Sequence, residues 1–176
     1  MTKLIDVFVS VGSNIEPNKN IVIALDRLRQ YVNVVAVSTF YQTKAIDRPS
    51  QADFVNGVFH IQTDIHPRKL KFDILRKIES DLGRIRSDDK YADRTIDLDI
   101  LIYDDIIIDE PDIVIPDKDI KKRPFIVIPL LELSPSLILP DTKEMLSSFD
   151  IIRIESNMKP VFELTEILKK GVANEP

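Results

Sequence analysis

Residues 82–103 read LGRIRSDDKYADRTIDLDILIY, and the second half of this stretch indicates how the chain folds. Between Ile96 and Ile100, apolar residues alternate with Asp97 and Asp99. Side chains two residues apart on a β-strand share a face, so this strand has one apolar face and one face with two carboxylates. The pattern predicts a strand that packs on helices with its apolar face and presents both aspartates on the opposite face.

The order of the neighbouring segments predicts the fold class. Strands are expected at residues 4–11, 34–41, 54–63 and 96–103, with helices from Pro17 to about Tyr31 and from Pro67 to Gly83. The order strand, helix, strand, strand, helix, strand is that of the ferredoxin-like βαββαβ fold. We therefore expect an α+β protein with an antiparallel sheet, helices on one face, an open substrate-binding face and C-terminal additions.

The segments outside this plan have weaker patterns. Residues 106–108 are expected to return as a strand beside residues 96–103. Residues 125–133 fit either a short helix or a buried extended run, because Pro129 is unfavourable inside a helix. A small helix is expected at residues 161–170. We expect one domain at residues 1–150, followed by a C-terminal extension at residues 151–176 that is packed on the domain or mobile.

The composition excludes several classes of function. The chain has 176 residues, and 24 basic against 29 acidic residues give a net charge of −5, which argues against a nucleic-acid partner. It has no cysteine, so disulfides, zinc fingers and thiol nucleophiles are excluded. Its four glycines are too scattered for a glycine-rich phosphate loop. No apolar run approaches the ~20 residues of a membrane span, and we expect a cytoplasmic protein.

Asp97 and Asp99 are the first candidates for chemistry. Carboxylates on one strand face repel each other unless a cation lies between them, and oxygen ligands without histidine or cysteine favour Mg²⁺. Four cationic residues lie nearby in the sequence: Arg84, Arg86, Lys90 and Arg94. Two carboxylates with Mg²⁺ and cationic side chains are typical of phosphoryl-type transfer from ATP. The alternative from the residues alone is a solvated strand face beside a charged loop.

The same segment resembles the signature of a known enzyme family. Gly83-Arg84-x-Arg86 and Arg94-Thr95-Ile96-Asp97-Leu98-Asp99 are similar to the motif of the 6-hydroxymethyl-7,8-dihydropterin pyrophosphokinases. Further matches follow in order at Gly12-Ser13-Asn14, Ser38-x-Phe40-Tyr41-x-Thr43, Asp53-Phe54-x-Asn56, Arg123-x-Phe125 and Pro129-Leu130. The resemblance spans about residues 4–145.

The resemblance implies an activity and a set of roles. Members of the family transfer diphosphate from ATP to the hydroxymethyl group of the dihydropterin and release AMP, in folate biosynthesis. By this resemblance, Asp97 and Asp99 hold two Mg²⁺ ions, and Arg84 and Arg94 pair with phosphate oxygens and stabilise the transition state. The resemblance further implies that nucleotide is bound by Glu79, Asp117 and Arg123, and the pterin by Thr43, Phe54, Asn56, Tyr91 and Phe125.

The resemblance also bears on partners. The expected partners are ATP, a dihydropterin and a neighbouring enzyme of the folate pathway, with no nucleic acid and no membrane. The expected oligomeric state is a monomer or a weak dimer. If Phe54 and Asn56 lie on the same sheet face as the two aspartates, an aromatic ring, an amide and the metal ligands converge there.

Three segments depart from the family pattern. Tyr91-Ala92-Asp93 replaces an aromatic-Gly-Pro sequence, Asp117 replaces a histidine that contacts ATP, and residues 43–47 lack the usual glycine. Asp117 would repel phosphate unless it reaches a metal or pairs with Lys118. An active enzyme is the leading hypothesis. A paralogue with another acceptor alcohol, or a non-catalytic module that binds Mg²⁺ and ATP, are the alternatives.

Overall fold

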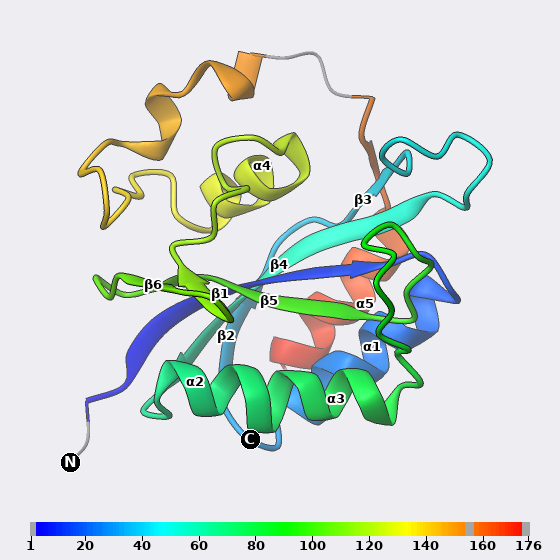
Figure 1. Ribbon diagram of the computed structural model, residues 1–176, viewed down its shortest axis with the longest axis horizontal. Helices are drawn as coiled ribbons and strands as arrows, with labels where there is room; N and C mark the ends of the chain where they lie inside the picture. Colours follow the sequence, from blue (N-terminus) through cyan, green and yellow to red (C-terminus); the bar gives the residue numbers. More distant parts are fainter. Residues whose placement is uncertain (1–2, 154–156, 174–176) are drawn as a thin grey trace.

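An antiparallel β-sheet of six strands runs through the centre of the molecule (Figure 1). The computed structural model describes residues 3–153 and 157–173. The sheet contains β1 (Ile5–Ser13), β2 (Asn33–Val37), β3 (Tyr41–Thr43), β4 (Phe54–Thr63), β5 (Asp97–Tyr103) and β8 (Lys159–Pro160). The strand order is β5-β1-β4-β3-β8, and β2 pairs with β4 beyond the end of β3. The predicted antiparallel sheet is therefore confirmed.

Helices lie on both sides of this sheet. They are α1 (Pro17–Leu28), α2 (Pro67–Lys69), the π-helix η1 (Leu70–Leu75), α3 (Arg76–Asp81), α4 (Pro124–Leu133), the 3₁₀ turns η2 (Leu146–Ser148) and η3 (Asp150–Arg153), and α5 (Phe162–Ala173). In Figure 1, α1, α2, α3 and α5 lie on one side of the sheet and α4 lies on the other. The second predicted helix is thus one continuous run from α2 through η1 to α3, with a π-helical turn in its middle.

The first core fills the space between the sheet and α1, α3 and α5. Alternate strand residues point into it, among them Val9 of β1, Phe59 of β4 and Leu98 of β5. Apolar residues at every second position bury that face of each strand. The apolar face predicted from Leu98 and Ile100 is the face that packs on the helices.

The second sheet face is not open along its whole length. Helix α4 covers one part of it, and Phe8, Val58 and Leu101 form a second buried cluster with Val127 and Leu130 of that helix. This helix shows no helical period in the sequence, because nearly every residue from 125 to 133 is apolar. The helix forms although Pro129 lies inside it.

Two predicted strands differ in the structure. The segment 34–41 is broken at residues 38–40, so that β2 and β3 are separate strands. Residues 106–108 do not return beside β5; instead β6 (Ile108–Glu110) pairs with β7 (Ile113–Ile115) in a separate two-stranded sheet. The alternation around Val114 explains this pairing, because it buries Ile113 and Ile115 in the first core.

The C-terminal segment returns to the main sheet. β8 pairs with β3, and α5 places Leu164 and Leu168 in the first core. The expected helix at residues 161–170 therefore corresponds to α5. Residues 154–156 and 174–176 of the expected extension lie outside the described residues. In the part of the chain that the structure describes, no helix combines the length and the apolar character needed to cross a membrane.

Candidate active site

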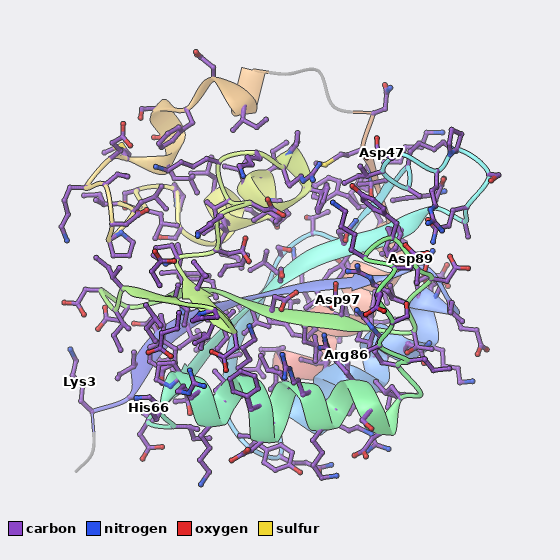
Figure 2. All side chains as sticks on the ribbon, viewed as in Figure 1. Lys3, Asp47, His66, Arg86, Asp89 and Asp97 are labelled. Carbon is purple, nitrogen blue, oxygen red and sulfur yellow. The ribbon has the colours of Figure 1, made fainter. Side chains whose placement is uncertain are left out.

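A cavity of about 460 Å³ lies on the second sheet face, beside the part that α4 covers. Ten of the residues expected in the site line it: Thr43, Phe54, Asn56, Tyr91, Arg94, Asp97, Asp99, Asp117, Arg123 and Phe125. In Figure 2, Asp97 lies at β5, while Asp47 and Asp89 lie in the two loops that flank the cavity. The structure thus brings the β4 residues and the two aspartates together on one face of the sheet.

Asn56 is fixed against β1 and β3. Its Nδ2 donates to Thr43 Oγ1 at 2.8 Å, and its backbone pairs with Gly12 in the β1–β4 register. A Cβ atom on Gly12 would lie 2.8 Å from Asn56 Oδ1, so only glycine leaves room for the amide at this point. The sequence pattern does not reveal this role of Gly12, although the residue belongs to the Gly12-Ser13-Asn14 match.

Asp97 is paired with two arginines. Arg84 Nη1 lies 3.0 Å from Asp97 Oδ1, and Arg94 Nη1 donates to Asp97 Oδ2. Arg84 Nη1 also donates to the Ile96 carbonyl at 2.9 Å. Arg84 does not line the main cavity; it lines an adjoining cleft of about 310 Å³ that shares Arg94, Asp97 and Asp99 with it. A charged ligand that reached Asp97 would therefore meet both guanidinium groups.

Asp99 stands among negative charges. Burial, together with the charges of Asp97, Glu79 and Asp117, raises the pKa of Asp99 to about 7. A bound cation would reverse this shift, because it stabilises the ionised carboxylate. Two strand carboxylates are an oxygen-only donor set, which fits Mg²⁺.

Few carboxylates at this point could hold a cation. Among the described residues, no group of three or more histidine, cysteine, aspartate or glutamate side chains has the arrangement of a metal site. Mg²⁺ commonly binds through one or two carboxylates and fills its other positions with water and substrate phosphates. Asp97 and Asp99 fit that mode of binding and do not form a closed protein cage.

Glu79 supports the strand that carries the aspartates. It is 1% exposed, its Oε1 accepts a hydrogen bond from Leu98 N at 2.8 Å, and its Oε2 accepts one from Arg86 Nη2. Burial raises the pKa of Glu79. Glu79, which the family resemblance implies as a nucleotide-binding residue, does not line the main cavity. Because Leu98 lies between Asp97 and Asp99, the contact fixes the backbone from which both aspartates project.

Asp93 joins the two loops that flank the cavity. Its Oδ1 accepts hydrogen bonds from Asn14 Nδ2 at 2.6 Å and from Gln51 Nε2 at 2.5 Å. Gln51 Nε2 also donates to the Tyr91 carbonyl at 2.8 Å, and Arg48 pairs with an aspartate of the facing loop, Asp89, at 2.8 Å. The departure from the family pattern at Asp93 therefore adds an anchor for the loop, because amide groups occupy its carboxylate.

Asp117 faces the cavity without pairing to its neighbour. Lys118 Nζ lies 3.3 Å from Asp109, so Lys118 is paired elsewhere, and of the two conditions that would offset the Asp117 charge the contact with a metal is left. Asp117 Oδ1 accepts from Asp119 N at 2.7 Å, and burial raises the pKa of Asp117. Asp117 and Asp99 also line a cleft of about 190 Å³ together with Lys71, which brings a cation to this side.

Comparison with known proteins decides the family. A family model described as 7,8-dihydro-6-hydroxymethylpterin-pyrophosphokinase (HPPK) matches residues 8–135. The chain belongs to the HPPK family. Within this family, the 2-amino-4-hydroxy-6-hydroxymethyldihydropteridine pyrophosphokinase of Haemophilus influenzae is 36% identical over 143 residues, covering 80% of this chain and 88% of that protein. The protein of the same name from Aquifex aeolicus is 32% identical over 155 residues, covering 88% of this chain and 94% of the other.

HPPK sequences also occur within longer proteins. The folic acid synthesis protein fol1 of Pneumocystis carinii is 34% identical over 157 residues, which are 88% of this chain and 21% of that protein. The crystal structure of wild-type Plasmodium falciparum HPPK-DHPS superposes with a TM-score of 0.64 at 13% identity, covering 84% of this chain and 44% of that chain. At that identity the likeness concerns the fold alone.

Proposed function

We propose that this HPPK-family chain transfers diphosphate from ATP to the hydroxymethyl group of 6-hydroxymethyl-7,8-dihydropterin, forming AMP and the pterin diphosphate in folate biosynthesis. The names of the relatives support the activity. The observation that carries the proposal is that one cavity joins an aromatic and amide surface to two strand aspartates.

The acceptor fits the aromatic part of the cavity. Phe54, Tyr91 and Phe125 offer rings to a flat bicyclic pterin, and Asn56 offers an amide donor and acceptor to its polar edge. Thr43 accepts the hydrogen bond that holds the Asn56 amide in place. An acceptor bound in this way could direct its hydroxymethyl group toward the aspartates of β5.

The donor fits the charged part. Asp97 and Asp99 would hold the two Mg²⁺ ions, which supply charge neutralisation and orientation of the phosphates when bound. Arg94 and Arg84 lie within reach of the same aspartate and would pair with phosphate oxygens as negative charge develops. Arg123 and Asp117 line the same cavity, and we assign them to the nucleotide side. Glu79 acts on this side through the backbone of β5.

The proposal includes the finer architecture and the setting. The sheet order and the connections support a ferredoxin-like core, with the substrate-binding face restricted to the part that α4 leaves free. The fused relatives support a neighbouring folate-pathway enzyme as a partner. A cytoplasmic location and a monomer or weak dimer belong to the same proposal.

The test is AMP formation from ATP and Mg²⁺, with and without the dihydropterin. AMP should form only with the pterin, and Asp97→Asn should lower the rate about a hundredfold or more, because a metal ligand is lost. Asp88→Asn removes the same charge from the exposed 84–95 loop and serves as the matched control. Mg²⁺-dependent ATP binding without pterin-dependent AMP would contradict the proposal and favour another acceptor or a non-catalytic module.

A further inference from the structure

Residues 38–40, which form the crossing between β2 and β3, make hydrogen bonds to three different elements: β4, α4 and α5. Ser38 exchanges hydrogen bonds with β4, because its N donates to the Val58 carbonyl at 2.9 Å and its Oγ accepts from Val58 N at 2.9 Å. Thr39 N donates to the Glu132 carboxylate of α4 at 3.0 Å. Phe40 N donates to Thr165 Oγ1 of α5 at 2.9 Å. Each residue of the crossing therefore has its own anchor.

The anchor at Phe40 is a closed loop of hydrogen bonds. Thr165 Oγ1 accepts from Phe40 N and donates to the Val161 carbonyl at 2.9 Å. Val161 N in turn donates to the Phe40 carbonyl at 2.8 Å. Thr165 is 2% exposed and Phe40 is fully buried, so water cannot replace these bonds. The start of α5 is thereby joined to the residue that precedes β3.

The contact continues along β3 toward the cavity. β8 pairs with β3 through Tyr41 opposite Pro160 and Gln42 opposite Lys159. Gln42 Nε2 donates to Asp53 Oδ2 at 2.7 Å, at the end of the loop that flanks the cavity. The last residue of β3, Thr43, accepts the Asn56 hydrogen bond in the site.

A second path runs through the Phe40 ring. A Cβ atom on Gly57 would lie 2.6 Å from this ring, so the ring presses directly on the β4 backbone. Gly57 lines the cavity and follows Asn56 in the sequence. Phe40 is thus in contact with the underside of the strand that carries the amide.

We propose that Thr165 is a positioning residue for the acceptor side of the cavity, acting through Phe40 and β3 on Thr43 and Asn56. Thr165 lies beyond residues 8–135, where the family model matches. The segment after that match would then contribute to acceptor binding without touching the acceptor. The kinetic part of this inference rests on the proposed function.

Thr165→Val tests the inference, because it keeps the shape and removes the hydroxyl. The KM for the dihydropterin should rise about fivefold, the factor that corresponds to roughly 1 kcal/mol for one hydrogen bond. The KM for ATP and kcat should stay near the wild-type values. Thr165→Ser should restore the KM, since it restores the hydroxyl.

Leu168→Ala is the matched control, because it weakens α5 one turn away from Thr165. It should lower the melting temperature and leave the KM for the pterin unchanged. Equal changes of both KM values in Thr165→Val, or the same kinetic change in Leu168→Ala, would overturn the inference, since either result would show an effect that is not specific to Thr165 and the acceptor side.

Amide hydrogen exchange separates this inference from the proposed function and covers the case in which Thr165→Val folds poorly. In Thr165→Ser, protection of residues 40–43 should stay near wild type, whereas Thr165→Ala should lose protection there before β2 and β1 do. Unchanged protection of residues 40–43 in Thr165→Ala would overturn the positioning role even if the wild-type protein forms no AMP. Absence of AMP in the wild type would reject only the proposed activity.

Discussion

At the scale of single residues, Gly12 controls where the Asn56 amide lies. In Gly12→Ala the new Cβ would meet Asn56 Oδ1 at 2.8 Å, so the amide must move and its bond to Thr43 must lengthen. We expect the KM for the dihydropterin to rise about fivefold or more, with little change in the KM for ATP. Steady-state kinetics with each substrate varied in turn would measure this difference.

Two other glycines show the contrast between a crowded and an uncrowded position, and Gly171 gives the control. Gly57→Ala would place Cβ 2.6 Å from the buried Phe40 ring, so we expect a loss of stability of about 1–3 kcal/mol from overpacking. Gly171 lies inside α5, where a Cβ would have ordinary contacts at 3.8 Å. Gly171→Ala should therefore stabilise the protein by about 0.5–1 kcal/mol and leave both KM values unchanged. An unchanged pterin KM in Gly12→Ala would contradict the assignment of Asn56.

Asp99 makes Mg²⁺ binding depend on pH. Its pKa of about 7 is raised by burial and by neighbouring carboxylates, so the folded protein binds a proton there that an unfolded chain would release at lower pH. Mg²⁺ must displace this proton, and its apparent affinity should fall about tenfold from pH 8 to pH 6. Calorimetric titration in buffers of different ionisation enthalpy would measure the affinity and the proton release together.

The same raised pKa of Asp99 also affects folding stability, which should fall as pH rises, whereas the affinity for Mg²⁺ should rise. A carboxyl whose pKa is raised in the folded state costs stability once it ionises, so the metal-free protein should lose stability as pH rises from about 4 to about 7. Asp99→Asn should remove this loss and the pH dependence of Mg²⁺ binding. Proton release that persists in Asp99→Asn would show that another group is responsible.

The sequence predicted the aspartates better than the residues that support them. Asp97 and Asp99 stand out because charged residues interrupt an apolar strand at every second position. The sequence pattern does not identify the supporting role of Glu79. Its partner is the backbone N–H of Leu98, and every residue type except proline has such a group. Asp93 stands out in the sequence only as a departure from the family pattern, because its amide partner Asn14 lies far away in the sequence.

At the scale of elements, periodic segments were predicted and segments without a period were not. The alternation in β5 predicted its two faces correctly, because burial on one side has a period of two residues. α4 has no period, since both its sheet-facing and outer residues are apolar. The break between β2 and β3 depends on Glu132 and Thr165, which come from helices far along the chain.

The segment after β5 is a second case in which distant contacts, and not the local pattern, determine the structure. The turn after Tyr103 was predicted, and Ile106 N donates to the Tyr103 carbonyl at 3.0 Å. The strand after the turn pairs with β7 and not with β5, because Ile113 and Ile115 gain burial in the first core. Tertiary contacts decide which of two strands the segment pairs with, and a local residue pattern contains no information on these contacts.

At the scale of the whole molecule, both cores share the strands β1, β4 and β5. Residues of β4 contribute Phe59 to the first core and Val58 to the second, so neither core can be lost alone without exposing the sheet. The segment after residue 150 enters the first core through α5. A boundary near residue 150, which the weakening pattern suggested, therefore crosses a packed surface.

A chain truncated after Asp150 tests that boundary. Leu164 and Leu168 are each 1% exposed, and burying two leucines contributes about 3–6 kcal/mol. Since a domain of this kind is stable by only about 5–15 kcal/mol, the truncated chain should unfold at a much lower urea concentration. Leu164→Ala with Leu168→Ala in the full chain should reproduce most of that loss, because it empties the same part of the core and keeps β8. An unchanged urea midpoint in the truncated chain would mean that residues 1–150 are a complete folding unit.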